Sequence, residues 1–221
     1  MTVRERTGKR LGGRILNDFW VFPARLLLRP FKRFDEMKYE RAGSYPFAFF
    51  MLLLSALLSV LEFVYGGFLT NYHDIYGVDS LYLSLTVLFP VALFVVGNWC
   101  VTTLMDGKGR LGEIFMATMY AMFPLCLTRI AALILSNVLT LDEMTISYTV
   151  QGVGVFAFCL YLFIGLVVVH EYSFGRGVGS IVLTLLAMMV LVFILMLVFT
   201  LVADLWDFVV VFTKELMLKL F

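Results

Sequence analysis

Two ionisable residues, Glu62 and Arg129, lie well inside the long apolar runs of this sequence. Each comes 16 residues after the start of its run, at Pro46 and Glu113, which is a rise of about 24 Å along a helix. An unpaired charge at that depth in an apolar environment is costly. We therefore expect Glu62 and Arg129 either to form an ion pair between neighbouring helices or to reach the nearby outer surface separately.

Asn98 adds a polar side chain to the second apolar run, and Pro90 and Pro124 should loosen the second and third runs locally. Such residues can line a transport path, but they also bend a helix and join it to a neighbour. The sequence is therefore compatible with a small transporter or channel that uses Glu62, Asn98 and Arg129, although a structural use of such residues is more common.

Residue patterns typical of catalysis or metal binding are missing from the sequence. His170 and Glu171 lack the second histidine of the HExxH pattern of zinc hydrolases, and His73 falls in a different segment. There is no GxSxG nucleophile motif and no GxxxxGKS/T phosphate-binding loop. We therefore expect no enzymatic activity, no metal and no cofactor. The three cysteines lie within apolar runs, which favours free thiols over disulfides; they are Cys100, Cys126 and Cys159.

Composition indicates that membrane-spanning helices hold these residues. The chain is 62% hydrophobic and 15% charged, with a mean hydropathy of +0.96, whereas soluble domains carry about 25% charged residues. We predict an all-α polytopic membrane protein with a five-helix transmembrane bundle over residues 46–203. Each of the five runs is long enough to cross a hydrocarbon layer of about 30 Å; they are residues 46–70, 81–105, 114–138, 150–170 and 178–203.

Charge is distributed unevenly along the chain, although the net charge is only +1. Residues 1–45 hold 11 of the 17 Lys and Arg residues but 5 of the 16 acids. The loops at 71–80 and 139–149 contain no Lys or Arg, whereas the turns at 106–113 and 171–177 contain three. Because basic segments stay on the cytoplasmic side, we expect a cytoplasmic N-terminus and, after five spans, a C-terminus outside the cell membrane.

The basic N-terminal segment, residues 1–45, is expected to contain short amphipathic helices at the membrane interface. Phe31, Phe34 and Met37 recur at helical spacing and form one apolar stripe. These helices either lie on the cytoplasmic leaflet or pack on the cytoplasmic loops of the same protein. The other sides of the segment carry the candidate contacts to anionic lipid head groups, which are Lys32, Arg33, Lys38 and Arg41.

Residues 204–221 form a third region after the five spans. They stay largely apolar, but their charged residues and short length argue against a sixth span. We expect an amphipathic helix there, at the outer interface or packed against the bundle.

A polar turn separates the second and third spans. Its two cations mark it as cytoplasmic, and we expect its glycines to adopt backbone angles that other residues resist. Glu113 follows in the first turn of the next helix, where the helix dipole favours an acid. The turn consists of Asp106, Gly107, Lys108, Gly109 and Arg110.

Three segments carry a family resemblance: RPFKRFDEMKYERAGSYPFAF, NWCVTTLMDGKGRLGEIFMATMYAMFPL and VVVHEYSFGRG. Together with five predicted spans, they resemble bacterial members of the Yip (Ypt/Rab-interacting protein) domain family from about Arg29 to Asp204. Eukaryotic members bind Rab-type GTPases and shape membranes through a long N-terminal region. This sequence matches neither that region nor its DLYGP motif, so the resemblance extends to the membrane domain alone. Many bacterial members are encoded beside sugar-importing ABC transporters, which implies by analogy an accessory subunit of such a transporter.

The leading functional hypothesis is a non-enzymatic integral membrane scaffold or accessory subunit. Its expected partners are the lipid bilayer and another membrane protein, such as a subunit of a sugar ABC transporter, or a second copy of the chain; no nucleic acid is expected. One alternative is the transporter or channel described above. The other is a membrane-organising protein that acts through its basic N-terminal helices.

Overall fold

The computed structural model of this protein describes residues 19, 21–68 and 79–220, and the regular elements found there are all helical. The predicted all-α fold, with five helices long and apolar enough to cross a membrane, is confirmed. Residues 1–18 of the basic N-terminal segment and the loop around His73 lie outside the described residues. The elements are α2 (Phe22–Leu28), α3 (Pro30–Tyr39), α4 (Tyr45–Tyr65), α5 (Ser80–Leu104), α6 (Leu111–Ser136), the 3-10 helix η3 (Leu141–Glu143), α7 (Met144–His170) and α8 (Phe174–Leu220).

The fourth long helix, α7, begins earlier than the predicted span at residue 150 because a capping box precedes it. The Glu143 carboxylate accepts the Thr140 N–H at 3.2 Å and the Thr140 hydroxyl at 3.0 Å. Polar residues in the first turns lower the hydropathy but do not stop the helix. One of them, Ser147, is buried and donates to the Ala132 carbonyl of α6 at 3.3 Å.

The two short N-terminal helices, α2 and α3, pack on α6 and α7 of the same protein. Leu26 and Phe34 are fully buried, and the Phe34 ring occupies the space that a side chain at Gly165 would need. The Tyr161 hydroxyl of α7 donates to the Leu27 carbonyl at 2.6 Å. The sequence left two placements open for these helices, on the membrane leaflet or against the protein itself. The inner side of both helices packs against the protein. Their outer side exposes Leu28, Phe31 and Lys32.

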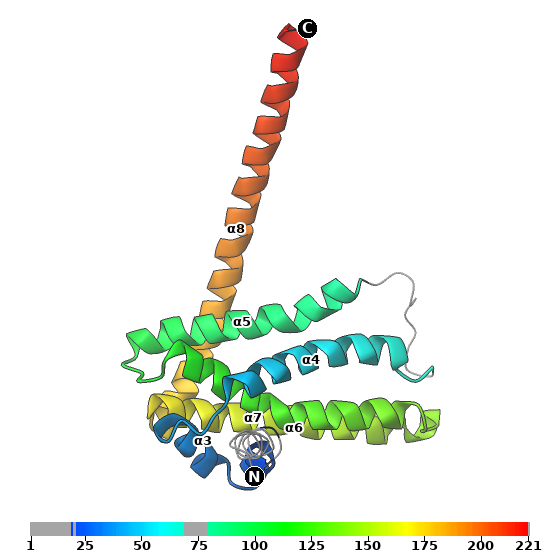
Figure 1. The fold of residues 1–221 in the computed structure, drawn as a ribbon, viewed down its shortest axis with the longest axis vertical. Helices are drawn as coiled ribbons and strands as arrows, with labels where there is room; N and C mark the ends of the chain where they lie inside the picture. The colour runs from blue at the N-terminus through cyan, green and yellow to red at the C-terminus, as the bar shows by residue number, and fades with distance from the viewer. Residues whose placement is uncertain (1–18, 20, 69–78, 221) are drawn as a thin grey trace, which may run out of the picture.

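Helices α4, α5, α6 and α7 lie alongside one another, with α6 between α4 and α7 (Figure 1). Aromatic rings fill the contact between α4 and α6. The rings of Phe47 and Tyr120 are 4.7 Å apart between centroids, and Phe22 of α2 packs edge-on against Tyr120 at 5.4 Å. The Tyr120 hydroxyl also accepts the Ser44 N–H at 3.0 Å, so the start of α4 is held by the middle of α6.

The fifth long helix, α8, is a single helix of 47 residues, so the predicted C-terminal helix at 204–221 continues the fifth span without a break. The sequence explains this, because it has no proline after Pro124 and no glycine after Gly179. The first half of α8 packs on α5 and α7, and the helix then leaves the α4–α7 layer at a steep angle (Figure 1). Every side chain from Phe193 to Lys219 is exposed except Val210, which is half-buried.

Close approach of α6 and α7 depends on Gly154. A Cβ atom at this position would collide with Thr128 Oγ1 and lie 2.8 Å from Thr128 Cβ. The Thr128 hydroxyl donates to the Leu125 carbonyl at 2.9 Å, which holds the side chain in place. Gly152, two residues earlier on α7, faces open space.

We predict that Gly154→Ala lowers the free energy of unfolding by about 1–3 kcal/mol, because the added methyl group forces α6 and α7 apart. Thermal unfolding of the detergent-solubilised protein, followed by circular dichroism, measures the effect. Gly152→Ala is the matched control, and it should be neutral or slightly stabilising because alanine favours a helix more than glycine does. Equal midpoints for the two variants would contradict the close packing.

Candidate functional site

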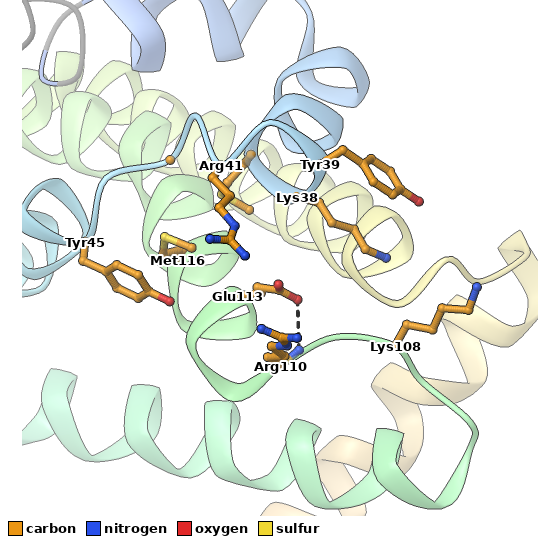
Figure 2. A pocket seen from close by; sticks show the side chains of 10 residues that line it. Lys38, Tyr39, Arg41, Tyr45, Lys108, Arg110, Glu113 and Met116 are labelled. Carbon is orange, nitrogen blue, oxygen red and sulfur yellow. Dashed lines mark hydrogen bonds between the residues drawn. The ribbon is translucent and has the colours of Figure 1, made fainter.

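A cavity of about 560 Å³ opens between the C-terminal end of α3, the linker from α3 to α4, and the start of α6 (Figure 2). Four of its ten lining side chains are cationic and one is anionic, so the cavity favours anions. The lining residues are Met37, Lys38, Tyr39, Arg41, Gly43, Tyr45, Lys108, Arg110, Glu113 and Met116.

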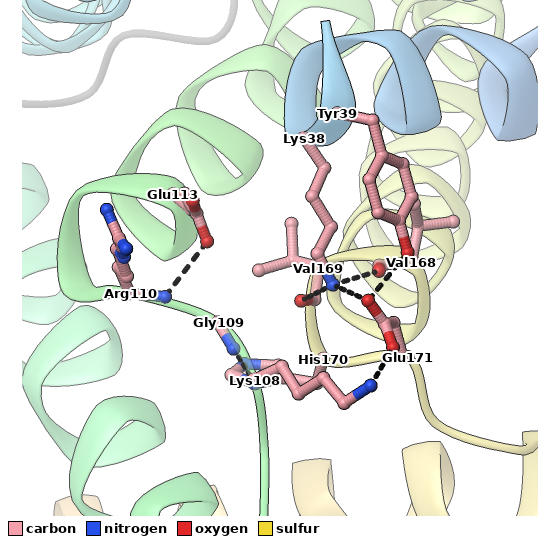
Figure 3. Close-up of polar contacts among 10 residues, drawn as sticks. All are labelled: Lys38, Tyr39, Lys108, Gly109, Arg110, Glu113, Val168, Val169, His170 and Glu171. Atoms are coloured by element: carbon pink, nitrogen blue, oxygen red, sulfur yellow. Dashed lines mark hydrogen bonds and ion pairs between the residues drawn. The ribbon is translucent and has the colours of Figure 1, made fainter. Parts of the chain in front are cut away.

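Glu171 gathers hydrogen-bond donors from two distant segments at the edge of this cavity (Figure 3). Lys38 Nζ and the Tyr39 hydroxyl of α3 donate to Oε1, at 2.8 and 2.6 Å. Lys108 Nζ, from the turn between α5 and α6, donates to Oε2. One carboxylate therefore connects α3, this turn and the end of α7.

Lys38 also caps the C-terminal end of α7. Its Nζ donates to the Val169 carbonyl at 2.8 Å, and its side chain is only 9% exposed. The last carbonyls of a helix lack partners within the helix and carry the negative end of its dipole, so a cation is favourable there. Glu171 follows in the left-handed region at φ 56°, which ends the helix. These contacts fasten α3 to α7.

The three donors change the acidity of the groups around Glu171. Hydrogen bonds from Lys108, then Lys38 and Tyr39, lower the pKa of Glu171 from 4.5 to about 2. The same carboxylate raises the pKa of the Tyr39 hydroxyl, chiefly because it accepts a hydrogen bond from that hydroxyl. Glu171 is therefore ionised throughout the physiological range.

Next to this cluster, a chain of neutral polar groups joins α7, α5 and α8. The Gly109 N–H donates to His170 Nδ1 at 3.3 Å, which leaves Nε2–H to donate to Asn98 Oδ1 at 3.1 Å. Asn98 Nδ2 donates to Thr184 Oγ1 at 2.9 Å, and the Thr184 hydroxyl donates to the Ser180 carbonyl at 2.7 Å. Asn98, His170 and Thr184 are almost fully buried, so each depends on these partners.

Glycines in the turn are required by close contact, not by their backbone angles. The described glycines all have negative φ, and Asp106 is the turn residue with a left-handed conformation, at φ 57°. A Cβ atom at Gly107 would lie 2.6 Å from the Tyr172 hydroxyl, and one at Gly109 would lie 2.7 Å from His170 Cε1. The expectation that these glycines adopt unusual backbone angles was therefore wrong. The turn needs glycine because its backbone lies directly on the His170 and Tyr172 rings.

Glu62 and Arg129 lie together between α4 and α6. Arg129 Nε donates to Glu62 Oε1 at 2.8 Å, and Nη2 donates to Oε2 at 2.6 Å. Nη2 also donates to Ser59 Oγ at 3.1 Å, and Ser59 and Glu62 share one face of α4. The two charged side chains are 30% and 18% exposed, respectively, so the contact is partly buried.

A comparison with protein families matches residues 24–202 to the Yip1 domain. The chain belongs to the Yip1 family. Neither the curated proteins nor the solved structures contain a match. Family membership together with five long apolar helices makes this a multi-pass membrane protein.

The Yip1 domain brings two groups of sequence candidates together. Lys38 and Arg41 from the N-terminal segment line the same cavity as Lys108 and Arg110 from the polar turn. Lys32 and Arg33 do not line it. Both contact Glu36 on their own helix, and the Arg33 guanidinium also lies 5.5 Å from the centre of the Phe22 ring.

Asn98 does not share a site with Glu62 and Arg129. Its side chain bonds to His170 and Thr184, whereas the ion pair belongs to α4 and α6. The three residues of the transport hypothesis thus fall into two separate polar clusters in the described part of the Yip1 domain.

Sequence reasoning missed the roles of Tyr39, Glu171 and Thr184. Glu171 had a usable signal, because an acid directly after a helix faces the negative end of the dipole and calls for cationic partners. Thr184 gave a weaker one, as a hydroxyl in an otherwise apolar run. Tyr39 gave none, because an aromatic residue beside a membrane is common for other reasons.

The lowered pKa of Glu171 predicts a pH-dependent contribution to stability. The ionised carboxylate stabilises the folded protein at pH values above 4.5, and this contribution is lost as the pH falls from 4.5 to about 2. Wild type should therefore unfold at a higher temperature than Glu171→Gln at pH 7, and the difference should disappear towards pH 2. Glu215→Gln, which alters an exposed acid on α8, is the control and should match wild type. A difference that grew below pH 4.5 would contradict the assignment.

For the contact between Glu62 and Arg129, we predict strong coupling. Glu62→Gln and Arg129→Gln should each destabilise the protein, because each leaves one partly buried charge unpaired. The double variant should lose less than the sum of the two, by about 1–3 kcal/mol. A double-mutant cycle of unfolding free energies in detergent measures this coupling. Additive losses would mean that the two charges act independently.

Proposed function

We propose that this Yip1-domain protein is a non-enzymatic membrane scaffold or accessory subunit that holds another membrane protein through α8. The observation that supports this is the exposure of α8. From Phe193 to Lys219, its side chains find almost no cover within the described chain. Large apolar surfaces of this kind are typical of sites where proteins or lipids bind.

The length of α8 argues that lipid alone does not cover it. Its 47 residues span about 70 Å, more than twice the roughly 30 Å of the hydrocarbon layer. The helix stays apolar beyond Asp204, where one side carries charged residues and the other carries a continuous apolar stripe. The exposed stripe, which we call the α8 tip face, includes Leu205, Trp206, Val209, Phe212 and Leu216.

The orientation of α8 supports the same proposal. Figure 1 shows that α8 leaves the layer of α4–α7 steeply, and beyond its first half the described chain supplies almost no contacts to it. A partner's helices would supply them.

The partner that the family resemblance suggests is a subunit of a sugar-importing ABC transporter, and a second copy of this chain is the other candidate. With either partner, the protein provides a binding surface and catalyses no reaction. Groups of three or more His, Cys, Asp or Glu side chains that could hold a metal are not found in the described ranges. The polar clusters there join helices to one another.

The test is the recovery of a stoichiometric complex from native membranes in mild detergent, with cross-linking and mass spectrometry to map the contact. We expect cross-links on the α8 tip face, and we expect the triple variant Trp206→Ser, Val209→Ser and Leu216→Ser to abolish the complex. The matched control changes the charged side of the same turns, with Phe208→Ser, Val211→Ser and Leu218→Ser, and should retain it. Recovery of the wild-type chain as a lone monomer would refute the proposal.

A further inference from the structure

A second hollow, an apolar groove of about 580 Å³, lies between α4, α5 and α6. Its lining is entirely aliphatic and aromatic apart from Gly112 and the Tyr45 hydroxyl. The lining residues are Tyr45, Phe49, Leu52, Leu88, Val91, Ala92, Val95, Val96, Leu111, Gly112 and Phe115. On α4 and α6 the groove follows the first two turns, so it begins next to the cationic cavity.

The groove and the cavity adjoin at Tyr45, which lines both. The Tyr45 ring lies on Gly112, where a Cβ atom would be 2.5 Å from the hydroxyl oxygen. Along the first turns of α6, Arg110 and Glu113 face the cavity while Leu111 and Phe115 face the groove. A polar compartment and an apolar one therefore meet at a single ring.

Two of the four cationic side chains that line the cavity already form ion pairs. Lys38 and Lys108 share the carboxylate of Glu171, and the Glu113 carboxylate accepts the Arg110 N–H at 3.0 Å. Among the described residues, the guanidinium groups of Arg41 and Arg110 have neither an ion-pair nor a hydrogen-bond partner.

The backbone around each of the two arginines is also distinctive. Arg41 is held in the left-handed region at φ 51°, which is unfavourable for a residue with a Cβ and directs its side chain from a constrained position (Figure 2). Arg110 is the N-cap of α6, so the positive end of that helix dipole lies at the same place. Guanidinium groups bind phosphate oxygens in pairs of hydrogen bonds.

We propose that the cavity and the groove together bind one anionic phospholipid. Its phosphate lies between Arg41 and Arg110, and one acyl chain lies along the groove beneath Tyr45. Charge complementarity selects the head group, and the continuous apolar lining selects a lipid over a soluble phosphate. The inference goes beyond the scaffold proposal, because the site is formed by α3–α6 and does not involve the α8 tip face.

Native mass spectrometry of the purified full-length protein in detergent tests the site, with phosphatidylglycerol, phosphatidylcholine and glycerol phosphate as separate probes. We expect one bound phosphatidylglycerol, held at least about tenfold more tightly than phosphatidylcholine, and no retained glycerol phosphate. The Arg41→Gln and Arg110→Gln double variant should lose about tenfold or more in affinity for phosphatidylglycerol, since each cation near a membrane surface contributes roughly a fivefold factor. The control variant Arg25→Gln and Arg29→Gln removes two exposed arginines outside the cavity and should bind like wild type.

A second pair of variants tests the groove without touching the charges. Ala92→Trp fills the groove from an exposed position, whereas Leu85→Trp adds the same ring at an exposed position of α5 outside it. The first should weaken phosphatidylglycerol binding several-fold and the second should not. Equal binding of the charged and zwitterionic lipids, an unchanged affinity in the arginine double variant or in Ala92→Trp, or glycerol phosphate bound as well as the lipid would each overturn the proposal.

Discussion

The carboxyl end of α7 sets an electrostatic requirement that the segments around it must meet. The helix ends in carbonyls without helical partners, and Glu171 adds a full negative charge where the dipole is already negative. Lys38 and Lys108 meet that requirement from two other segments, and Tyr39 adds a third donor. The position of α3 and the path of the polar turn both follow from this one helix end. The cationic cavity exists because those segments are drawn together there.

Burial imposes a second requirement just behind this cluster. His170, Asn98 and Thr184 come from three helices, and each would be costly to bury without a partner. Their donors and acceptors match in one consistent direction, from the Gly109 N–H to the Ser180 carbonyl. Neutral hydrogen bonds suit such a place, because they need no counter-ion in surroundings of low dielectric constant. This chain adds polar contacts to the apolar packing of α8 on α5 and α7.

Much of the fold could be predicted from the sequence, because hydropathy and length alone identify five spanning helices and residues 178–203 contain no charge. The matched depth of Glu62 and Arg129 was also visible, since both lie the same number of residues from a membrane interface.

The features that could not be predicted from the sequence depend on tertiary contacts. Whether α3 lies on lipid or on protein is decided by the fit of Phe34 against Gly165, and a hydrophobic stripe looks the same in either case. The role of Glu171 could not be predicted either, because its hydrogen-bond donors come from α3 and from the turn between α5 and α6, which are distant in the sequence. Residues 204–221 were expected to form a separate helix because charged residues reappear there. Charged residues alone do not end a helix, and this segment has no glycine or proline to break it.

The uninterrupted α8 has a mechanical consequence. Thr184 lies near one end of a rigid rod whose other end is 36 residues away, about 54 Å along the axis. A rotation of about 5° at the Thr184 contact moves that far end by about 5 Å. Because α8 has no break, a small tilt where it packs on α5 would reach the distant tip as a displacement as large as a side chain.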